Sequence, residues 1–292
     1  MSETSQPYRS PLRLTALFLV IIILPLVIGL YAAPRIVPKP QIGIIRLNYE
    51  IDADTAYLIT EQMAYARNNP AVKAVVLMIN SPGGSAAYSE ELFLDVLQTR
   101  SNHLPVVATV DLLAASGAYY TAVAADEIYA KPTSNIGSVG VISFLQGDVF
   151  IDEDILTTGP YKSFGGTRDS TVRQIERAKL AFLEAVKTGR SDRLTIDLDV
   201  LSRAEIYTGV QALEFGMIDG LAANDEVINR AAALAGLSDY EVVELFPLTF
   251  GDELEFSFVD YQPEAIDEAR LWAHPSNLAP GLYYRYIDTP SN

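Results

Sequence analysis

The sequence predicts an α/β fold in which largely parallel strands alternate with helices, preceded by an N-terminal transmembrane helix. Short apolar runs recur from residue 42 onward, and the segments between them have helical periodicity. Residues 74–79 form a continuously apolar run, which is typical of a parallel strand buried on both faces. An earlier run, residues 14–33, holds twenty uncharged, mostly apolar residues, enough to span a bilayer core.

The N-terminal run extends from Leu14 to Ala33 and is bounded by Arg13 and Arg35. As a helix rising 1.5 Å per residue, it would be about 30 Å long. A cleaved signal peptide is the alternative, but its apolar region usually has about 7–15 residues. Cleavage after Ala33 would also leave Pro34 just past the cut. We therefore favour an uncleaved single-pass anchor.

The strands and helices beyond the anchor follow one another in regular alternation. Apolar runs predict strands at residues 42–47, 74–79, 105–110, 127–130 and 136–144. Helical periodicity predicts helices at residues 52–67, 89–99, 116–125, 169–188, 209–215 and 225–235. This order divides the chain into an N-terminal segment (1–13), the anchor (14–33), a Pro-rich linker (34–40), a globular α/β domain (41–244) and an acidic, aromatic C-terminal extension (245–292).

Composition restricts the classes of function. The 292 residues are 49% hydrophobic and 20% charged, as in a folded protein. The formal net charge of −16 argues against nucleic acid as a partner. Residues 239–268 are acidic without a basic side chain, and we interpret them as a solvated face rather than a metal site. We expect no cofactor and no metal. Cysteine is absent, which excludes disulfides and a thiol nucleophile.

Two turns that follow apolar strands carry residues suited to acyl transfer. Gly83 and Gly84 end one strand, and glycines there let a substrate carbonyl approach backbone N–H groups. Ser116 and Gly117 follow another strand and open a helix rich in small residues. Taken alone, the first is an ordinary turn and the second an ordinary N-cap. Together they supply an oxyanion-binding turn and a nucleophile.

A base for such a nucleophile is harder to place. The chain has two histidines, His103 in a polar loop and His274 in the C-terminal extension, and neither lies where a catalytic triad is expected. Lys162 is the alternative, with Tyr161 and Phe164 as apolar neighbours. A lysine is ordinarily protonated at neutral pH, and desolvation favours loss of that proton. A solvated surface lysine is the competing interpretation.

These motifs occur together, and from about residue 42 to residue 243 the chain resembles the signal peptide peptidase A family. That family consists of membrane-anchored serine proteases with a Ser-Lys dyad, of the same broad fold group as Clp protease and crotonase. The resemblance rests on several motifs in matching order: Asn-Ser-Pro-Gly-Gly (80–84), Ala-Ser-Gly-Ala-Tyr-Tyr (115–120), Ala-Ala-Asp-Glu-Ile (124–128), Gly-Ser-Val-Gly-Val (137–141), Tyr-Lys (161–162), Tyr-Thr-Gly (207–209) with Gln-Ala (211–212), and Gly-Met-Ile-Asp (216–219).

The resemblance implies a role for each matching residue. Ser116 would be the nucleophile, and Lys162 the general base and then the acid that protonates the leaving amine. Gly83, with the amide of Gly117, would form the oxyanion hole. Ser138 would hydrogen-bond and orient the lysine.

The resemblance also implies an assembly and a substrate class. Short members of the family form rings in which neighbouring subunits share each site, so we expect a homo-oligomer whose dyad is completed across an interface. The implied substrates are apolar, signal-peptide-like peptides. The family places its globular part outside the cytoplasm, with the membrane contacted through residues 14–33.

The chain departs from the family in two places. The segment 163–202 is shorter than the family leads us to expect, and residues 245–292 have no clear counterpart in the motif set. Three other functions remain open from the sequence: a non-catalytic scaffold with this fold, an NfeD-type membrane protease that acts on a stomatin-like partner, and a crotonase-type enzyme that binds coenzyme A. The crotonase-type enzyme would not need both Ser116 and Lys162.

Overall fold

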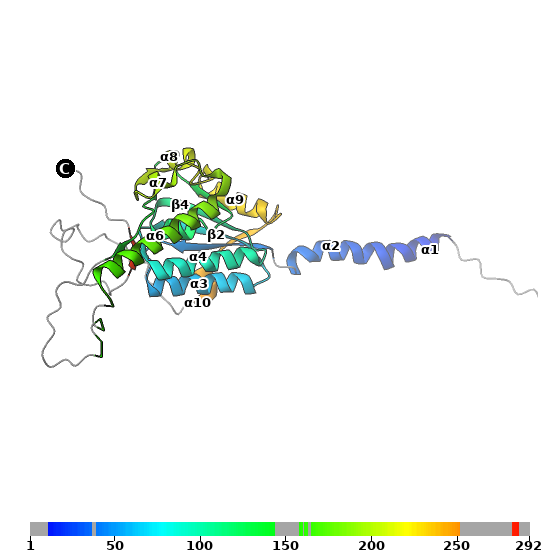
Figure 1. Cartoon of the computed structure of the whole chain (residues 1–292). Helices are drawn as coiled ribbons and strands as arrows, with labels where there is room; N and C mark the ends of the chain where they lie inside the picture. The colour runs from blue at the N-terminus through cyan, green and yellow to red at the C-terminus, as the bar shows by residue number, and fades with distance from the viewer. Residues whose placement is uncertain are drawn as a thin grey trace, which may run out of the picture. The chain divides into compact units, whose positions relative to one another are not determined.

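The computed structural model describes residues 11–36, 39–143, 158–159, 161–162, 165–251 and 282–285. The chain divides into two compact units, Met1–Pro40 and Gln41–Asn292, which are described separately (Figure 1). The second unit holds all the candidate site residues.

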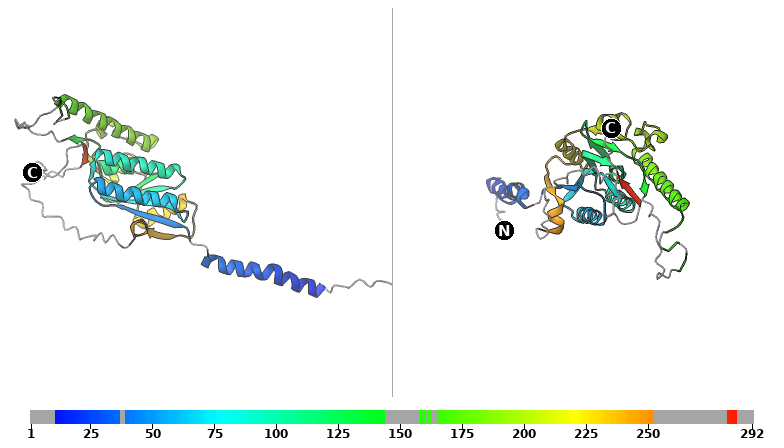
Figure 2. Two further views of the ribbon diagram at one scale, coloured as in Figure 1. Left: turned by 90° about the horizontal axis from the view of Figure 1, so that it is seen from below. Right: turned by 90° about the vertical axis from the view of Figure 1, so that its left-hand side faces the viewer.

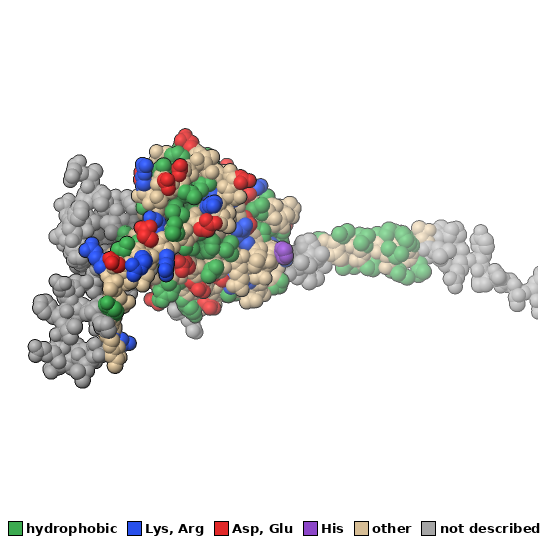
Figure 3. Space-filling view, viewed as in Figure 1, with side chains coloured by type: hydrophobic (Ala, Val, Ile, Leu, Met, Phe, Trp, Pro, Cys, Tyr) green, Lys and Arg blue, Asp and Glu red, His purple; other side chains and the backbone are tan. Residues whose placement is uncertain are grey.

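The first unit is helical and apolar. It contains α1 (Pro11–Phe18), a π-helical turn η1 (Leu19–Ile23) and α2 (Leu24–Ile36). The large apolar side chains from Leu17 to Tyr31 are exposed, and Figure 3 shows hydrophobic atoms over most of the described part of this unit. Among the described residues, no helix combines the length and apolar character needed to cross a membrane. The anchor expected at residues 14–33 stays a prediction.

The second unit is built on strands that alternate with helices. Its strands are β1 (Gln41–Leu47), β2 (Val72–Ser81), β3 (Gly83–Ser85), β4 (Val106–Ala115), β5 (Glu127–Ala130), β6 (Asn135–Gly137), β7 (Ile142–Ser143), β8 (Ile206–Thr208), β9 (Gly220–Leu221), β10 (Glu241–Glu244) and β11 (Leu282–Arg285). Its helices are α3 (Ala53–Asn68), α4 (Ala86–Ser101), α5 (Gly117–Ala122), α6 (Arg168–Arg190), the 3₁₀ turn η2 (Ser191–Arg193), α7 (Leu198–Leu201), α8 (Gly209–Glu214), α9 (Asn224–Leu234) and α10 (Leu245–Phe250).

Most strands join one mixed sheet in the order β10-β1-β2-β4-β5-β9. Every neighbouring pair in that order is parallel. β6 extends the sheet by pairing with β4 in parallel and with β8 in antiparallel orientation. A second, three-stranded sheet has the order β3-β11-β7. The predicted α/β fold with mainly parallel pairing is confirmed.

Helices cover both faces of the main sheet (Figures 1 and 2). Successive strand residues point to opposite faces, so β2 sends Val75, Leu77 and Ile79 to one core and Ala74, Val76 and Met78 to another. The first core is closed by α3, α4, α5 and α6, and the second by α9. Burial on both faces explains why β2 is apolar without alternation.

The structure places the predicted elements with shifts of a few residues at their ends, the largest at the strand predicted for 105–110, which is β4 and extends to Ala115. One element differs more clearly. The predicted strand at 136–144 is two strands, β6 and β7, which belong to different sheets. Ser138 follows β6 with a left-handed backbone (φ 53°), and this turn ends the strand. Sequence periodicity did not predict the short strands β3, β8, β9, β10 and β11 or the helices α7 and α10.

Candidate active site

Ser116 lies at a sharp turn between strand β4 and helix α5. Its backbone has φ 55° and ψ −122°, a conformation that non-glycine residues rarely adopt and that costs about 1–3 kcal/mol. Its N–H donates to the carbonyl of Gly137 at 2.8 Å, which holds the turn against β6. A strained strand-to-helix turn is the backbone arrangement that presents a serine nucleophile in many hydrolases.

The Ser116 hydroxyl has no hydrogen-bond partner within the described part of the chain. Although Ser116 occupies the N-cap position of α5, its side chain accepts no hydrogen bond from the helix. Its Oγ is buried and unpaired among the described residues, and only 1% of the residue is exposed. An unpaired buried hydroxyl costs about 1–3 kcal/mol. The N-cap interpretation of Ser116 is therefore wrong, and a strained turn with an unused hydroxyl favours a functional role.

Ser138 lies beside Ser116 because the strands that precede them are paired. β4 and β6 are parallel neighbours with Ala115 opposite Gly137, so each serine directly follows one member of the same pair. Ser138 is 7% exposed, and its N–H donates to the carbonyl of Glu205 at 2.8 Å. The structure thus brings these two predicted site residues together at the carboxyl edge of the sheet.

The Gly-Gly turn reaches the same edge from β2, in which Ser81 pairs with Ala114 of β4. Gly83 has φ 87°, which favours glycine. Its N–H, the predicted oxyanion donor, donates to Ser81 Oγ at 3.1 Å. Ser81 Oγ in turn donates to the carbonyl of Tyr49 at 2.5 Å. A substrate oxyanion at Gly83 would therefore replace an internal hydrogen bond.

Ser81 is a site residue whose role the sequence did not reveal. It is fully buried and uses its hydroxyl both to accept from Gly83 and to donate to Tyr49. The sequence feature that could have identified Ser81 is its position between a buried strand and the two glycines, because a buried polar residue there needs hydrogen-bond partners.

The Gly117 amide is the second predicted oxyanion donor. Gly117 is the first residue of α5 and directly follows Ser116. N–H groups in the first turn of a helix have no acceptor within that helix. Its position therefore suits the predicted role, in which an N–H next to the nucleophile contacts the substrate oxygen.

Lys162 is not hydrogen-bonded to Ser116 within one chain, because the Ser116 hydroxyl has no partner among the described residues. The Lys162 side chain is exposed. Its backbone N–H donates to the carbonyl of Gly159 at 3.3 Å in a turn. Residues 144–157, 160 and 163–164, which flank this turn, lie outside the described residues. The predicted dyad is therefore not assembled within a single chain here.

The two tyrosines of α5 do not supply an alternative base. The Tyr119 hydroxyl donates to the carbonyl of Met217 at 2.9 Å, and burial raises the pKa of Tyr119. Burial also raises the pKa of Tyr120 to about 12, aided by the nearby charge of Glu90. Both hydroxyls therefore stay protonated at neutral pH, and neither accepts a proton from serine.

Helix α6, which follows Lys162 in the chain, is fixed to the domain through its C-terminal half. Phe182 packs edge-on against Tyr120 of α5 with ring centroids 4.9 Å apart. Phe182, Ala185, Val186 and Arg190 are its buried residues, all in that half. The N-terminal half contains no buried residue and reaches past the sheet (Figures 1 and 2).

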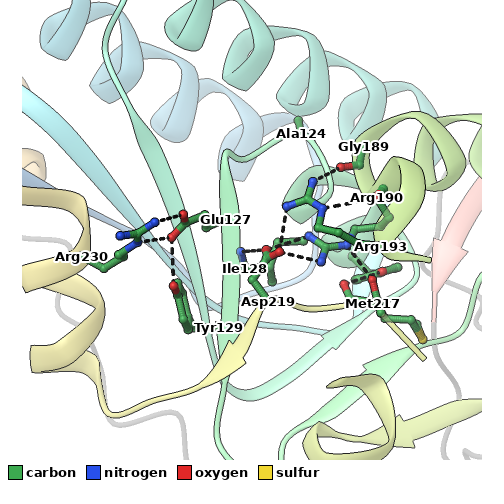
Figure 4. Close-up of polar contacts among 12 residues, drawn as sticks. Ala124, Glu127, Ile128, Tyr129, Gly189, Arg190, Arg193, Met217, Asp219 and Arg230 are labelled. Atoms are coloured by element: carbon green, nitrogen blue, oxygen red, sulfur yellow. Dashed lines mark hydrogen bonds and ion pairs between the residues drawn. The ribbon is translucent and has the colours of Figure 1, made fainter. Parts of the chain in front are cut away.

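A buried ion pair holds the last residue of α6 (Figure 4). Arg190 is 1% exposed and binds both carboxylate oxygens of Asp219, at 2.8 and 2.9 Å. Arg193 adds a contact to Asp219 at 2.7 Å, and the Ile128 N–H adds another at 2.7 Å. Burial alone would raise the pKa of Asp219, but these hydrogen bonds and positive charges outweigh it and hold the pKa below its ordinary value.

The described residues contain no cluster of three or more histidine, aspartate or glutamate side chains that could hold a metal ion. The chemistry available at this edge of the sheet is that of three buried serines (Ser81, Ser116 and Ser138), a glycine turn and the first residues of a helix. These groups define the class of the protein: an α/β protein whose Clp-protease-like domain carries a strained, buried serine at the carboxyl ends of parallel strands.

Comparison with known proteins identifies the family. The model of peptidase family S49 matches residues 98–238, and that of Clp protease matches residues 40–137. The chain belongs to peptidase family S49, the family that includes signal peptide peptidase SppA.

Several of the relatives are named as proteases. The chain is 30% identical over 194 residues to Protease 4 of Salmonella typhi, covering 62% of this chain and 31% of that protein. It is 26% identical over 223 residues to the chloroplastic serine protease SPPA of Arabidopsis thaliana, covering 68% of this chain and 32% of that protein. The chain thus spans about a third of the length of these two relatives. The solved structure of a mutant of the 1510-N membrane-bound stomatin-specific protease aligns with a TM-score of 0.49 at 15% identity, covering 71% of this chain and 98% of that chain.

Proposed function

We propose that this chain is a serine endopeptidase of the SppA kind, with Ser116 as the nucleophile and Lys162 as the general base. The observation that carries the proposal is the Ser116 turn, where a strained backbone holds a buried hydroxyl without a partner among the described residues. A non-catalytic scaffold gains nothing from that arrangement, because both features destabilise the fold.

The proposed reaction begins when Ser116 Oγ attacks a peptide carbonyl while Lys162 takes its proton. The C–O bond forms, and the carbonyl electrons move to the oxygen, where the N–H groups of Gly83 and Gly117 stabilise the charge. The oxygen lone pair then re-forms the carbonyl and expels the amine, which Lys162 protonates. Water then attacks the acyl-enzyme carbonyl while Lys162 takes its proton. The C–O bond to Ser116 breaks, Lys162 returns a proton to Ser116 Oγ, and the product acid leaves. Ser138 orients the lysine amine.

The proposal requires Lys162 to approach Ser116 and to lose contact with water. A lysine serves as a base only when it is desolvated, and the Lys162 side chain is exposed in the single chain. A second copy of the chain meets both requirements if the Lys162 turn of one subunit covers the Ser116 turn of the next. We therefore propose a homo-oligomer with each dyad shared between neighbouring subunits.

The proposed substrates are apolar peptides of the signal-peptide kind, cleaved outside the cytoplasm by a chain attached to the membrane through residues 14–33. Attachment is supported by the uncharged composition of this run and by its exposed apolar side chains from Leu17 to Tyr31. Alkaline carbonate extraction of membranes tests attachment: the chain should remain in the pellet, and a variant with residues 14–33 deleted should not.

The first experiment compares the full chain, purified in detergent, with its Ser116→Ala and Lys162→Ala variants on a fluorogenic peptide with a small or apolar P1 residue. The wild type should hydrolyse the peptide, and its rate should rise between about pH 6 and pH 10 as an amine deprotonates. Each variant should lose activity by about a thousandfold or more. Lys162→Arg should fail as well, because guanidinium keeps its proton.

Circular dichroism and size-exclusion chromatography control for folding and assembly of each variant. Hydrolysis that survives Ser116→Ala would reject serine as the nucleophile, and hydrolysis that survives Lys162→Ala would reject lysine as the base. A folded oligomer without serine-dependent hydrolysis of several peptides would favour the scaffold function.

A further inference from the structure

One turn of the domain, residues 216–219, holds two helices of the candidate site. From α5, the Tyr119 hydroxyl donates to the Met217 carbonyl at 2.9 Å. From the last residue of α6, Arg190 Nε donates to the neighbouring Gly216 carbonyl at 2.9 Å (Figure 4). Because these two carbonyls are adjacent in the chain, the turn fixes α5 and α6 at one place.

The ends of the two helices also touch. A Cβ added to Gly189, the residue before Arg190, would collide with the carbonyl of Val123, which follows the last residue of α5. The absence of a side chain at Gly189 therefore lets α6 end directly against α5. Farther along α6, Phe182 packs against Tyr120, so the two helices are in contact at both ends of the buried segment of α6.

Helix α6 leads back to the predicted base. Lys162 lies six residues ahead of Arg168, the first residue of α6. The Gly165 N–H donates to the Tyr161 carbonyl at 2.8 Å, and this turn includes Lys162. Six residues span at most about 22 Å, so the position of α6 limits where the Lys162 turn can lie.

The buried segment of α6 is short compared with the part that projects. At 1.5 Å per residue, the segment from Phe182 to Arg190 is about 12 Å long, and the part from Arg168 to Phe182 is about 21 Å long. If Phe182 acts as the pivot, a shift of about 1 Å at Arg190 moves Arg168 by about 2 Å. The contacts of Arg190 therefore control the direction of the projecting half.

The guanidinium of Arg190 is suited to this task by its shape. Its two terminal nitrogens bind the Asp219 carboxylate at 2.8 and 2.9 Å, while Nε binds the Gly216 carbonyl. A planar group with donors in fixed directions holds an angle, whereas an ammonium is a point charge on a flexible stem. Arg190→Lys therefore keeps a cation beside Asp219 and loses the fixed angle.

We infer that Arg190 is a positioning residue for the proposed Ser-Lys dyad, acting through α6 on the place at which Lys162 is held. The inference rests on the proposed function in one respect: Lys162 of one subunit must serve Ser116 of the next. Arg190 then acts on the lysine that its own subunit donates, not on the serine of that subunit. A misplacement of about 1 Å can lower a rate about a hundredfold, so the effect should be large.

Mixed oligomers of the full chain test this direction of action. A Ser116→Ala chain donates only the lysine, and a Lys162→Ala chain donates only the serine, so complete sites form where the two meet. Arg190→Lys added to the lysine donor should lower kcat per complete site about tenfold or more and leave KM near its value without the substitution. Added to the serine donor instead, it should change neither constant.

Arg230→Lys is the matched control. Arg230 binds the Glu127 carboxylate with two nitrogens in the same manner, but it lies on α9 and not on α6. It should leave both mixtures unchanged. Equal loss of activity with Arg190→Lys in either donor would indicate a general effect on the fold and overturn the inference, as would no loss in either donor.

A measurement that needs no activity separates this inference from the proposed function. The chain has no cysteine, so spin labels can be attached to cysteines introduced at two exposed positions, Gln98→Cys on α4 and Gln174→Cys on α6. Dilution of the labelled full chain into unlabelled chain makes the distance within one chain dominant. Electron–electron dipolar spectroscopy should give a distance distribution about twofold wider in Arg190→Lys than in the wild type or Arg230→Lys, because the projecting half of α6 amplifies any shift at Arg190.

An unchanged distribution in Arg190→Lys would overturn the inference whatever the activity. A wider distribution, together with no hydrolysis by the mixture of Ser116→Ala and Lys162→Ala after proven subunit exchange, would keep Arg190 as the residue that orients α6 and reject the shared dyad.

Discussion

At the scale of single residues, the site combines features that reduce stability. Ser116 has a left-handed backbone and a buried hydroxyl that is unpaired among the described residues, and Ser138 beside it also has positive φ. Such residues persist where function requires them, so replacing them should increase the free energy of unfolding.

Replacing the nucleophile with glycine should make the protein more stable. Ser116→Gly relieves a φ of 55° and removes the buried hydroxyl, while the added freedom of the unfolded chain costs about 0.4–1 kcal/mol. We expect a net gain of about 1 kcal/mol in the free energy of unfolding and complete loss of hydrolysis. Urea denaturation measures the gain. Ser116→Ala is the matched control, because it removes the hydroxyl and keeps the strain. A loss of stability in Ser116→Gly would contradict the strained-turn argument.

The Ser81 hydroxyl should prove important for the Gly-Gly turn. Ser81→Ala leaves the Gly83 N–H and the Tyr49 carbonyl without their shared partner in a buried place. Each buried unpaired group costs about 1–3 kcal/mol, so the variant should lose at least that much stability. It should also hydrolyse peptide more slowly, because Gly83 is no longer held in place. Ser85→Ala is the control, since the Ser85 side chain makes no capping hydrogen bond. Equal denaturation curves for the two variants would refute the role of Ser81.

At the scale of elements, the sequence predicts β1, β2, β4, β5 and β6 of the main sheet, because each begins as a separate apolar run. It does not predict the short strands β8, β9 and β10 of the same sheet. The convergence of Gly83, Ser116 and Ser138 could also be predicted in outline, since parallel strands end at one edge of a sheet. The pairing of β3 with β11 could not, because those strands lie about 200 residues apart and local periodicity carries no information on such contacts. The division of 136–144 into β6 and β7 likewise depends on tertiary pairing.

The attachment of α6 also depends on a distant contact, which yields a prediction for acid stability. Removing one partner of a buried ion pair leaves the other charge uncompensated, so Asp219→Asn should destabilise the protein by about 3–5 kcal/mol. Because the folded-state pKa of Asp219 lies below its unfolded value near 3.9, its contribution is present above about pH 4 and is lost as the pH falls through the folded pKa.

Thermal unfolding between about pH 2 and pH 7 measures both effects. The wild type should lose stability below about pH 4 more steeply than Asp219→Asn, which has no carboxylate to protonate at that position. Arg193→Met is the control: it removes the outer partner of Asp219, whose side chain is 43% exposed, and should cost at most about 1 kcal/mol. If the wild type and Asp219→Asn lost stability equally steeply below about pH 4, protonation of Asp219 would not be the cause of the acid destabilisation.

At the scale of the whole molecule, the separation of the predicted dyad is the feature that decides between a monomeric and a shared site. Ser116 is buried in the core, whereas Lys162 is exposed in a turn ahead of the projecting half of α6. No sequence pattern could show which copy of the chain supplies each residue, because every copy contains both.

Mixing two inactive variants tests the shared site directly. Ser116→Ala keeps Lys162, and Lys162→Ala keeps Ser116, so a ring that contains both variants can rebuild complete dyads at interfaces where the two intact residues meet. With random mixing in equal amounts, half of the serines and half of the lysines are intact, and about a quarter of the sites should be complete. Refolding or exchanging the subunits together should therefore restore about a quarter of the wild-type rate, whereas mixing without subunit exchange should restore none. The double variant Ser116→Ala/Lys162→Ala mixed with either single variant is the control, because no interface in those mixtures brings the two intact residues together. Failure to recover activity after proven subunit exchange would place both residues of the dyad in one chain, which would then require the Lys162 turn to move onto the Ser116 turn of its own domain.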